Sequence, residues 1–489
     1  MKLKRTLLIT LLLSFIISMM SGCVKSAPGN TPGSPDVSAP GTNNTVKGQT
    51  EQRETGTGEQ GTAQNPISEP YIEDVVFREV PMDLGGREIK FLSAFPNRWR
   101  KNPNENAITP NEVLEVVEAL EQIEKDYNCK ITVEEIKGRN LLEQALAAKA
   151  AGDTLGDILE MDITGSYMES LYSEGIVMDM TNDPIIDLGG NPWLPQTQFA
   201  NMFGKQFGVH FLAKGSGDVL RGVLVYNKTM AEKYGLPDIY ELVRRKEWTF
   251  DKFREVCEII YSKAGGQVYP IGYSHEGIFI PLFVFANNGT YVDNTPEGYK
   301  YNALQENTLE ANNFVVELIK AGYVMPERGT DEMFMDGKYV FYFGNYSAQA
   351  KYKANMSDEY GLLPVPLGPK ASQYCAVTYN DSIFHIFNNI EKPEQVAAVL
   401  VAIANRCSKK NIIHDEMMTV LSNMESAEVF EILYRNVKCD LSRVVSTVRS
   451  IFKDANNKIL AREVTPAEIL ESIGSEVQSL LDQVIYKGE

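Results

Sequence analysis

The stretch Glu88-Ile89-Lys90-Phe91-Leu92 alternates polar and apolar side chains, as a strand with one buried face does. Thr109-Pro110-Asn111-Glu112 then predicts the start of a helix, with a capping box and a proline at the first helical position. Apolar residues keep helical spacing over residues 113–123, and Ile131 and Val133 alternate as the next strand. The sequence therefore predicts a β-α-β unit here.

The same alternation of strands and helices continues downstream, which favours an α/β fold whose sheets are covered by helices. After residue 393 the periodicity is almost wholly helical. The further expected elements are strands at 157–161, 206–212, 221–226, 268–273, 339–343 and 374–387, helices at 141–151, 166–173, 278–285 and 309–320, and a hairpin turn at 294–298.

The N-terminus has the pattern of a signal peptide over residues 1–22. Lys2, Lys4 and Arg5 precede an apolar run that is shorter than the roughly 20 residues needed to span a bilayer. Met20-Ser21-Gly22-Cys23 resembles the lipobox of bacterial lipoproteins, which implies that Cys23 carries lipid, palmitate included, and becomes the new N-terminus. An uncleaved membrane anchor is the alternative, and in either case we expect the rest of the chain outside the cytoplasm.

Residues 23–70 are predicted to be a tether. After Cys23 the segment is built mainly of Gly, Ser, Thr, Pro, Asn, Gln and Glu with almost no large apolar side chain, so it cannot bury enough apolar surface to fold. As a flexible coil it would have a reach of about 35–40 Å. It would keep a folded body close to the membrane.

The chain is acidic, with a net charge of −18 over 489 residues. Loss of residues 1–22 would leave 44 basic against 65 acidic residues, a charge near −21. This charge argues against a nucleic-acid partner, because binding to a phosphate backbone needs a basic surface.

Cysteine and histidine usage predicts neither a disulfide framework nor a metal site. Apart from Cys23 the five cysteines are odd in number and widely spaced, which favours buried thiols, although a bridge between Cys407 and Cys439 is left open. The four histidines are scattered, and no metal or cofactor motif is present. We therefore expect no cofactor.

Several fragments together resemble one known family. The fragments are Gly156-Asp157-Ile158-Leu159, Leu224-Val225-Tyr226-Asn227-Lys228, Glu247-Trp248-Thr249, Phe334-Met335-Asp336-Gly337-Lys338 with Gly344-Asn345-Tyr346, and Leu363-Pro364-Val365-Pro366. Their order over residues 85–405 resembles the extracellular solute-binding proteins of bacterial ABC importers, which include maltose- and oligosaccharide-binding lipoproteins.

The resemblance implies a two-lobed periplasmic-binding-protein-like (type II) fold. Each lobe would be a mixed sheet flanked by helices, and a hinge would join the lobes around a ligand cleft. Lobe 1 is predicted to comprise residues 71–218 with 375–405. Lobe 2 is predicted to comprise residues 219–374 with 406–489.

The function implied is a lipid-anchored monomer on the outer face of the cell membrane. It would capture a sugar or oligosaccharide and deliver it to the permease subunits of an ABC importer, without being an enzyme. Two alternatives stay open: a sensor lipoprotein for a membrane kinase, and a surface glycoside hydrolase, which would need two catalytic acids. No such pair stands out in the sequence.

Ligand-binding residues are expected in the loops that follow the strands, where open α/β sheets bind ligands. Aromatic rings there would stack on sugars, and polar groups would bind hydroxyls. Alternatively, Trp99 packs on its own loop, and Glu160 and Asp162 cap the next helix. His275 is a further candidate. The predicted set is Arg98, Trp99, Glu160, Asp162, Tyr273, Asn287, Asn288, Tyr379 and Asp381, together with Asn345 and Tyr346, to which the resemblance assigns the aromatic platform.

Overall fold

The computed structural model describes residues 75–101, 109–163, 168–216, 220–295, 298–378 and 382–487. Contacts divide the chain into residues 1–66 and residues 67–489, and every described element belongs to the second unit. The predicted signal peptide, Cys23 and the tether lie outside the described residues. Within the described ranges no helix has both the length and the apolar character that crossing a membrane requires.

The first sheet is mixed and has the strand order β13-β3-β1-β2. β1 (Arg87–Ser93) pairs in parallel with β2 (Cys129–Glu135) and β3 (Ile158–Asp162). β13 (Ser382–Ile386) returns from far along the chain and pairs antiparallel with β3. The predicted β-α-β unit is confirmed, because α2 (Asn111–Asp126) connects β1 to β2.

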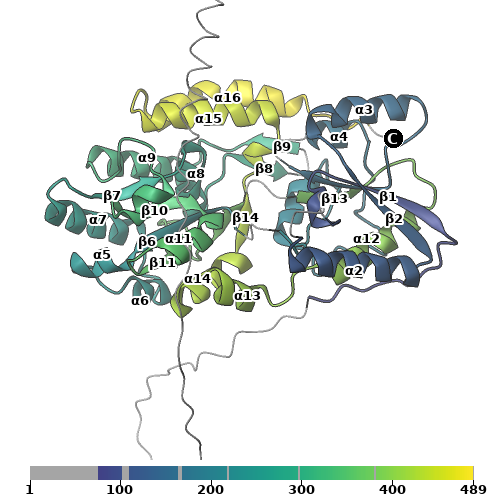
Figure 1. Cartoon of the computed structure of the whole chain (residues 1–489). Helices are drawn as coiled ribbons and strands as arrows, with labels where there is room; N and C mark the ends of the chain where they lie inside the picture. Colours follow the sequence, from purple (N-terminus) through teal and green to yellow (C-terminus); the bar gives the residue numbers. More distant parts are fainter. Residues whose placement is uncertain are drawn as a thin grey trace, which may run out of the picture. The chain divides into compact units, whose positions relative to one another are not determined.

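Helices cover this sheet in Figure 1. They are α2, α3 (Gly138–Ala150), α4 (Met168–Ser173) and α12 (Pro393–Cys407). Most of α12 is buried, and its run of small and β-branched apolar residues packs against the sheet with α2. The start of α2 differs from the expected one: Pro110 is its N-cap residue, and the Glu112 carboxylate accepts a hydrogen bond from Gly215 N at 2.8 Å.

The second sheet has the order β14-β12-β6-β10-β7, and β11 also pairs with β6. β7 runs parallel to β10, and β12 runs parallel to β14, whereas β6 is antiparallel to its neighbours. The strands are β6 (Gly222–Asn227), β7 (Tyr269–Tyr273), β10 (Tyr339–Asn345), β11 (Tyr360–Leu363), β12 (Ala376–Thr378) and β14 (Val437–Cys439). The separate hairpins are β4 (Asn201–Met202) with β5 (Lys205–Gln206) and β8 (Val292–Thr295) with β9 (Gly298–Tyr301).

The remaining helices belong with the second sheet or follow it in the chain. They are α5 (Lys228–Lys233), α6 (Ile239–Arg244), α7 (Phe250–Ala264), α8 (Glu276–Ala286), α9 (Glu306–Lys320), α10 (Asp331–Met335), α11 (Gln349–Asn355), α13 (Ile412–Thr419), α14 (Met424–Arg435), α15 (Ser446–Leu460) and α16 (Pro466–Asp482). Short 3-10 turns are η2 (Pro96–Arg98), η3 (Pro195–Ala200), η4 (Tyr346–Ala348) and η5 (Leu441–Arg443). In Figure 1, α15 and α16 lie side by side.

Thr249 and Trp248 explain why α7 begins at Phe250. The Thr249 side chain caps the helix by accepting a hydrogen bond from Lys252 N. The fully buried Trp248 indole donates to Pro364 O at 3.0 Å, which ties this helix start to the segment after β11.

Three details differ from the sequence-based expectations. β12 pairs with β6 in the second sheet, so the return to the first sheet comes a few residues later than the predicted boundary at 375. Residues 206–212 were expected to form one strand, but only Lys205–Gln206 and a bridge from Val209 to Phe384 are present. Cys407 and Cys439 are free thiols, so the bridge left open between them is not formed.

Candidate functional site

A cavity of about 630 Å³ opens where two strands of the second sheet end. His275 lines it two residues after the end of β7, and Asp440 lines it directly after β14. Both strands run parallel to a neighbour, and the register places Tyr273 of β7 beside Phe343 of β10 and Cys439 of β14 beside Thr378 of β12. The carboxyl ends of these strands therefore lie at one edge of the sheet. This is the edge at which open α/β sheets bind ligands.

Basic side chains outnumber acidic ones in the described lining of this cavity: they are Arg328, Arg443, Arg449 and Lys453, with His275 beside them. Arg443 Nη1 donates to Gly277 O at 3.2 Å. A Cβ built on Gly277 would lie 3.3 Å from Arg443 Nη1 and 3.4 Å from His275 Nδ1. The two basic groups therefore flank the same point at the start of α8.

Asp440 is the carboxylate among the described lining residues, and it is buried. It accepts hydrogen bonds from Ser442 N at 3.2 Å and from Ser442 Oγ at 2.6 Å. Burial raises the pKa of this carboxyl group, while Arg443 and Ser442 act in the opposite direction. Asp440 thus stabilises the turn that contains Arg443.

Two aromatic rings, which pack on each other, form the floor of the cavity. The rings of Tyr291 and Phe452 lie with their centroids 4.8 Å apart, and both side chains are almost fully buried. Tyr291 OH donates to Asn456 Oδ1 at 3.4 Å. This floor joins α15 to the segment before β8.

Elements of the first lobe touch the second lobe beside this cavity. Ser446, which lines the cavity, donates to Glu169 of α4 from both N and Oγ, at 3.4 and 3.2 Å. Cys439 Sγ lies 3.7 Å from Pro195 O of η3. The cavity therefore borders a hydrogen bond to α4, a helix that covers the first sheet.

The structure brings Arg98 and Trp99, which follow β1, together with Glu160, which lies within β3 rather than after it. Trp99 Nε1 donates to Glu160 Oε2 at 2.7 Å, and Arg98 Nη1 lies 3.3 Å from Glu160 Oε1. Burial raises the pKa of Glu160, against the opposing effects of Arg98, Ser93 and Trp99.

The environment of Trp99 is nevertheless a protein core. Its ring packs edge-on against Phe91, Phe211 and Phe384, and only 2% of the residue is exposed. The sequence-based alternative, packing on its own loop, differs from this environment too, because Phe211 and Phe384 lie far away in the chain. A ligand role for Trp99 stays a prediction, and the ring has no open face in this structure.

Tyr346 is also covered. Only 1% of it is exposed, its hydroxyl donates to Glu416 Oε2 at 2.6 Å, and its ring lies 5.5 Å from that of Phe430. Burial and the Glu416 carboxylate raise the pKa of the Tyr346 hydroxyl. Asn345 beside it is exposed at the end of β10. The C-terminal helices thus cover the predicted platform.

The other predicted residues are spread over the molecule. Asp162 is half-buried at the end of β3, and Tyr273 stacks on Phe279 at 4.9 Å. Asn287 and Asn288 follow α8 at the opposite end from His275, about 16 Å along the helix. Tyr379 and Asp381 lie outside the described residues.

Sequence reasoning missed the basic residues of the cavity. Arg449 and Lys453 lie four residues apart and hence on one face of α15. That spacing was the available signal, but no motif connected α15 to the strand ends. Within the described ranges no group of His, Cys, Asp and Glu residues is arranged to hold a metal ion.

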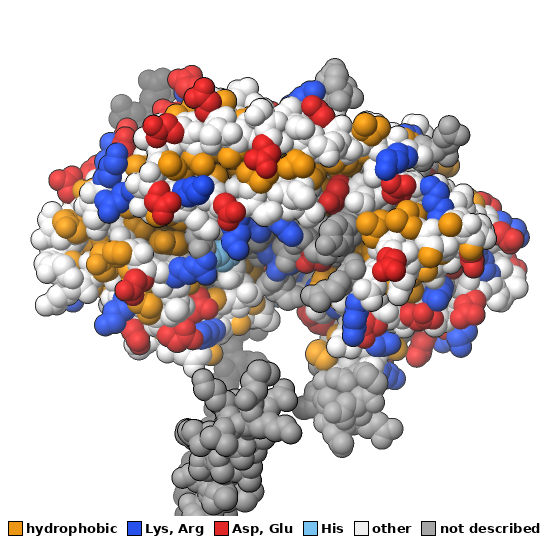
Figure 2. Space-filling model, turned by 90° about the horizontal axis from the view of Figure 1, so that it is seen from above, with side chains coloured by type: hydrophobic (Ala, Val, Ile, Leu, Met, Phe, Trp, Pro, Cys, Tyr) orange, Lys and Arg blue, Asp and Glu red, His pale blue; other side chains and the backbone are white. Residues whose placement is uncertain are grey.

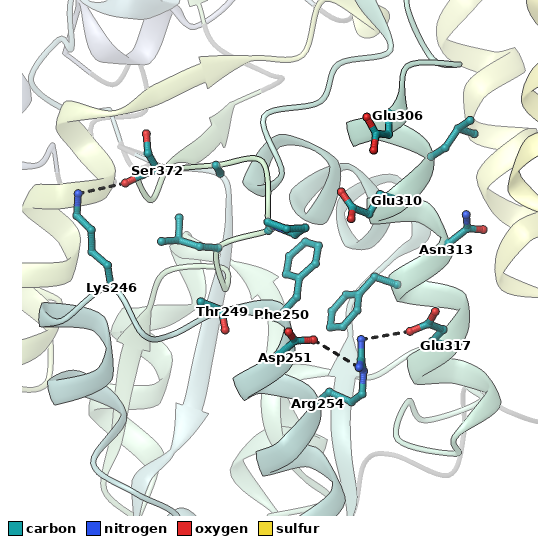
Figure 3. Close-up of a pocket in the computed structure, with 16 residues that line it drawn as sticks. Lys246, Thr249, Phe250, Asp251, Arg254, Glu306, Glu310, Asn313, Glu317 and Ser372 are labelled. Carbon is teal, nitrogen blue, oxygen red and sulfur yellow. Dashed lines mark hydrogen bonds and ion pairs between the residues drawn. The ribbon is translucent and has the colours of Figure 1, made fainter.

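A larger cavity of about 1140 Å³ lies between α7, α9 and residues 367–372 (Figure 3). Three of its charged groups pair with one another, since Arg254 contacts Asp251 at 3.4 Å and Glu317 at 3.3 Å. Asn287 links two segments next to this cavity: it donates a hydrogen bond to Glu310 Oε2 at 2.9 Å and accepts one from Lys370 N at 2.9 Å. We place the candidate site at the cavity beside His275 because that cavity lies where strands of the second sheet end.

Comparison with known proteins agrees with this fold. The model of a family described as bacterial extracellular solute-binding protein matches residues 118–407, more than half of the chain. A comparison with curated protein sequences found no significant match.

Solved structures of low sequence identity share the fold. The cyclic alpha-maltosyl-1,6-maltose binding protein of Arthrobacter globiformis is 16% identical with a TM-score of 0.59, covering 82% of this chain and 100% of its own. An extracellular solute-binding protein of Staphylococcus aureus in complex with maltose is 13% identical with a TM-score of 0.60, covering 81% and 98%. UgpB of Mycobacterium tuberculosis, in complex with glycerophosphocholine, is 17% identical with a TM-score of 0.55, covering 82% and 100%.

Proposed function

Because the chain belongs to the bacterial extracellular solute-binding proteins, we propose that it captures a sugar or oligosaccharide between its two lobes and delivers it to an ABC importer. The observation that carries the proposal is the position of the cavity beside His275. It lies at the strand ends of the second sheet and borders α4 of the first lobe. The structures of similar fold include binding proteins for maltose-type sugars, which supports a carbohydrate as the ligand.

Closure of the lobes would be the working step. Domain closure around a ligand is a hinge motion in which a few connecting residues change conformation. The contact between Ser446 and Glu169 lies at the rim of the cavity. A bound solute would touch groups on both sides of this contact and would thereby favour the closed arrangement.

A thermal-shift screen of carbohydrates tests this proposal. The sample would be the chain from residue 24 onward, screened against neutral and acidic mono- and oligosaccharides, with peptides and polyamines for comparison. A ligand at 100 times its dissociation constant adds about 2.7 kcal/mol to the free energy of unfolding. Shifts with peptides or polyamines and with no carbohydrate would contradict the proposed solute class.

We also propose that the chain binds its solute without changing it. The family and the similar structures are binding proteins. Incubation of the purified chain with the best-binding oligosaccharide, followed by chromatography of the products, checks this directly. Hydrolysis of the sugar would favour the glycoside hydrolase alternative instead.

The lipid anchor is the third part of the proposal. We expect Cys23→Ala to abolish incorporation of labelled palmitate and to release the chain from the membrane fraction into the medium, because a single tether cysteine would hold the whole body. Cys129→Ala, which removes a half-buried thiol of the folded part, is the matched control and should leave the chain membrane-bound. Membrane retention of the Cys23→Ala variant would contradict lipid anchoring at this residue.

A further inference from the structure

The start of α15 lacks a capping side chain of its own. Its N-cap residue is Val445, whose side chain makes no capping hydrogen bond, and its first turn contains no acidic residue. The first N–H groups of a helix have no partner within the helix and carry a partial positive charge, so they bond to water or to groups from other segments. The first turn of α15 is therefore open to a partner from elsewhere in the chain.

That partner is Glu169 of α4, a helix of the first lobe. Its Oε1 atom accepts hydrogen bonds from Ser446 N at 3.4 Å and from Ser446 Oγ at 3.2 Å. A carboxylate at this place matches the partial charge of the helix start. In Figure 1 the pair of α15 and α16 reaches from the second sheet towards α4, and this contact joins the two lobes. Both bonds are at the long end of the hydrogen-bond range, which makes the contact easy to break.

The helix that Glu169 caps carries part of the candidate site. Ser446, Ser450 and Lys453 of α15 line the cavity beside His275. Figure 2 looks onto the face that carries α15 and α16, and shows a hollow with Lys and Arg side chains around a histidine. A shift of the first turn of α15 would move these lining groups relative to the strand ends. Glu169 does not line the cavity, so it would act on the site through α15.

The second carboxylate oxygen of Glu169 makes the contact sensitive to protonation. Oε2 is buried without a hydrogen-bond partner, and only 8% of the residue is exposed. A buried charged oxygen without a donor costs more free energy than the same group in its neutral form. Burial accordingly raises the pKa of Glu169, against the opposing effects of its own backbone N–H, of Ser446 and of Arg449.

Three further titratable groups act on Glu169 or are acted on by it, and each keeps one charge around neutral pH. Arg449 in the first turn of α15 stays a cation, because a guanidinium group does not lose its proton in proteins. Tyr172 of α4 and Tyr299 of β9 lie within electrostatic range of the carboxylate, and burial raises the pKa of both hydroxyl groups, so both stay neutral. Among these four groups, Glu169 is therefore the one whose charge changes.

We propose that Glu169 is a positioning residue of the candidate site: by capping α15 from the other lobe it holds the lobes together beside the cavity, and loss of its proton weakens this hold. The inference rests on the proposed function, because it concerns the regulation of the same site. The joined lobes keep Glu169 buried, whereas separation exposes it to water and returns its pKa towards the ordinary value. The joined state therefore binds the proton more tightly, and by linkage the contact strengthens as the pH falls and weakens as the pH rises.

Hydrogen exchange of the chain from residue 24 onward, without any ligand, tests the inference. The readouts are protection factors, which are corrected for the intrinsic pH dependence of exchange, for residues 446–453 of α15 and residues 168–174 around α4. We expect protection in both segments to fall about threefold or more between about pH 5 and about pH 8. One proton allows at most about tenfold per pH unit.

Two substitutions separate the charge of Glu169 from its contact. Glu169→Gln keeps an acceptor for Ser446 and cannot ionise, so it should remove the pH response and retain protection at about pH 8. Glu169→Ala removes the acceptor and should lower protection several-fold at both pH values. The matched control is Glu174→Gln, which removes a carboxylate that bonds to Lys487 at 2.6 Å instead of to α15, and it should keep the pH response of the wild type.

The nearly isosteric Glu169→Gln decides the test even if Glu169→Ala does not fold. Loss of the pH response in Glu169→Gln and its retention in Glu174→Gln would support the inference, whether or not a carbohydrate binds. A response of Glu169→Gln equal to that of the wild type, or wild-type protection that rises with pH, would overturn the inference and leave the proposed function intact. The two claims therefore fail separately.

Discussion

At the scale of single residues, the buried histidine of the first sheet has a structural explanation. His385 is fully buried between the first sheet and α4. Its Nδ1 donates to Leu159 O at 3.2 Å, and its Nε2 accepts from Tyr172 OH at 2.9 Å. Both ring nitrogens are thus satisfied by a neutral imidazole, and burial lowers the pKa of His385 to about 4.

The lowered pKa of His385 predicts that the folded protein loses stability in acid. Because the folded pKa lies below the unfolded value, His385 contributes stability that is present above about pH 6.5 and is lost as the pH falls toward about 4. Between pH 7 and pH 5 this loss should amount to about 2 kcal/mol of the free energy of unfolding. His385→Gln should remove this pH dependence, as measured by urea unfolding at the two pH values.

The matched control is His414→Gln, at a histidine whose side chain is 51% exposed. It should retain the pH dependence of the wild type. Buried carboxyl groups with raised pKa, such as Glu160 and Glu416, act in the opposite sense, since their contribution is lost as the pH rises. The informative quantity is therefore the difference between each variant and the wild type, and equal differences for both variants would contradict the role of His385.

At the scale of elements, the segment after α16 connects parts that are far apart in the chain. Tyr486 packs against Phe203 and Phe207 at 5.7 and 5.9 Å, and Lys487 N donates to Ser173 O at 2.6 Å. α16 itself packs on α15 and β9. The last described residues therefore tie α4 and the β4–β5 hairpin to the C-terminal helices.

Tyr486→Ala should weaken this connection. We expect a loss of about 1–3 kcal/mol in the free energy of unfolding. This is less than the loss for truncating a fully buried aromatic side chain, because the ring of Tyr486 is half-buried. Hydrogen exchange should accelerate around residues 173–176 and 201–207. Tyr486→Phe keeps the ring contacts and should behave as the wild type, whereas identical behaviour of the two variants would show that the ring contributes nothing.

The elements could be predicted from sequence better than the site could. The strands β1, β3, β6 and β10 and the long amphipathic helices follow from local periodicity, which is carried by neighbouring residues. Trp99 was expected in a loop, but Phe211 and Phe384, which bury it, lie more than a hundred residues away in the chain. Long-range packing of this kind leaves no local signal.

The same reason explains the missed basic residues. Arg443, Arg449 and Lys453 belong to a helical region whose periodicity was evident, but their approach to His275 depends on how α15 packs on α8. Tyr346 shows the complementary case. Its position after β10 was expected, yet its burial depends on Glu416 and Phe430 from the C-terminal helices.

At the scale of the whole molecule, each sheet is completed by a distant segment. β14 follows β12 by about 60 residues, and β13 joins β3 in the first sheet after the chain has built most of the second. Neither sheet can be completed from one continuous stretch of chain. We therefore infer that the two lobes depend on each other during folding, as expected where chain-distant contacts dominate.

The antiparallel pairing of β13 with β3 has a consequence for synthesis. Ser382, which pairs with Asp162, is added about 220 residues later, and at roughly 5–20 residues per second this takes roughly 10–45 s. For that time the outer edge of β3 has no partner strand, and open strand edges are templates for wrong pairing.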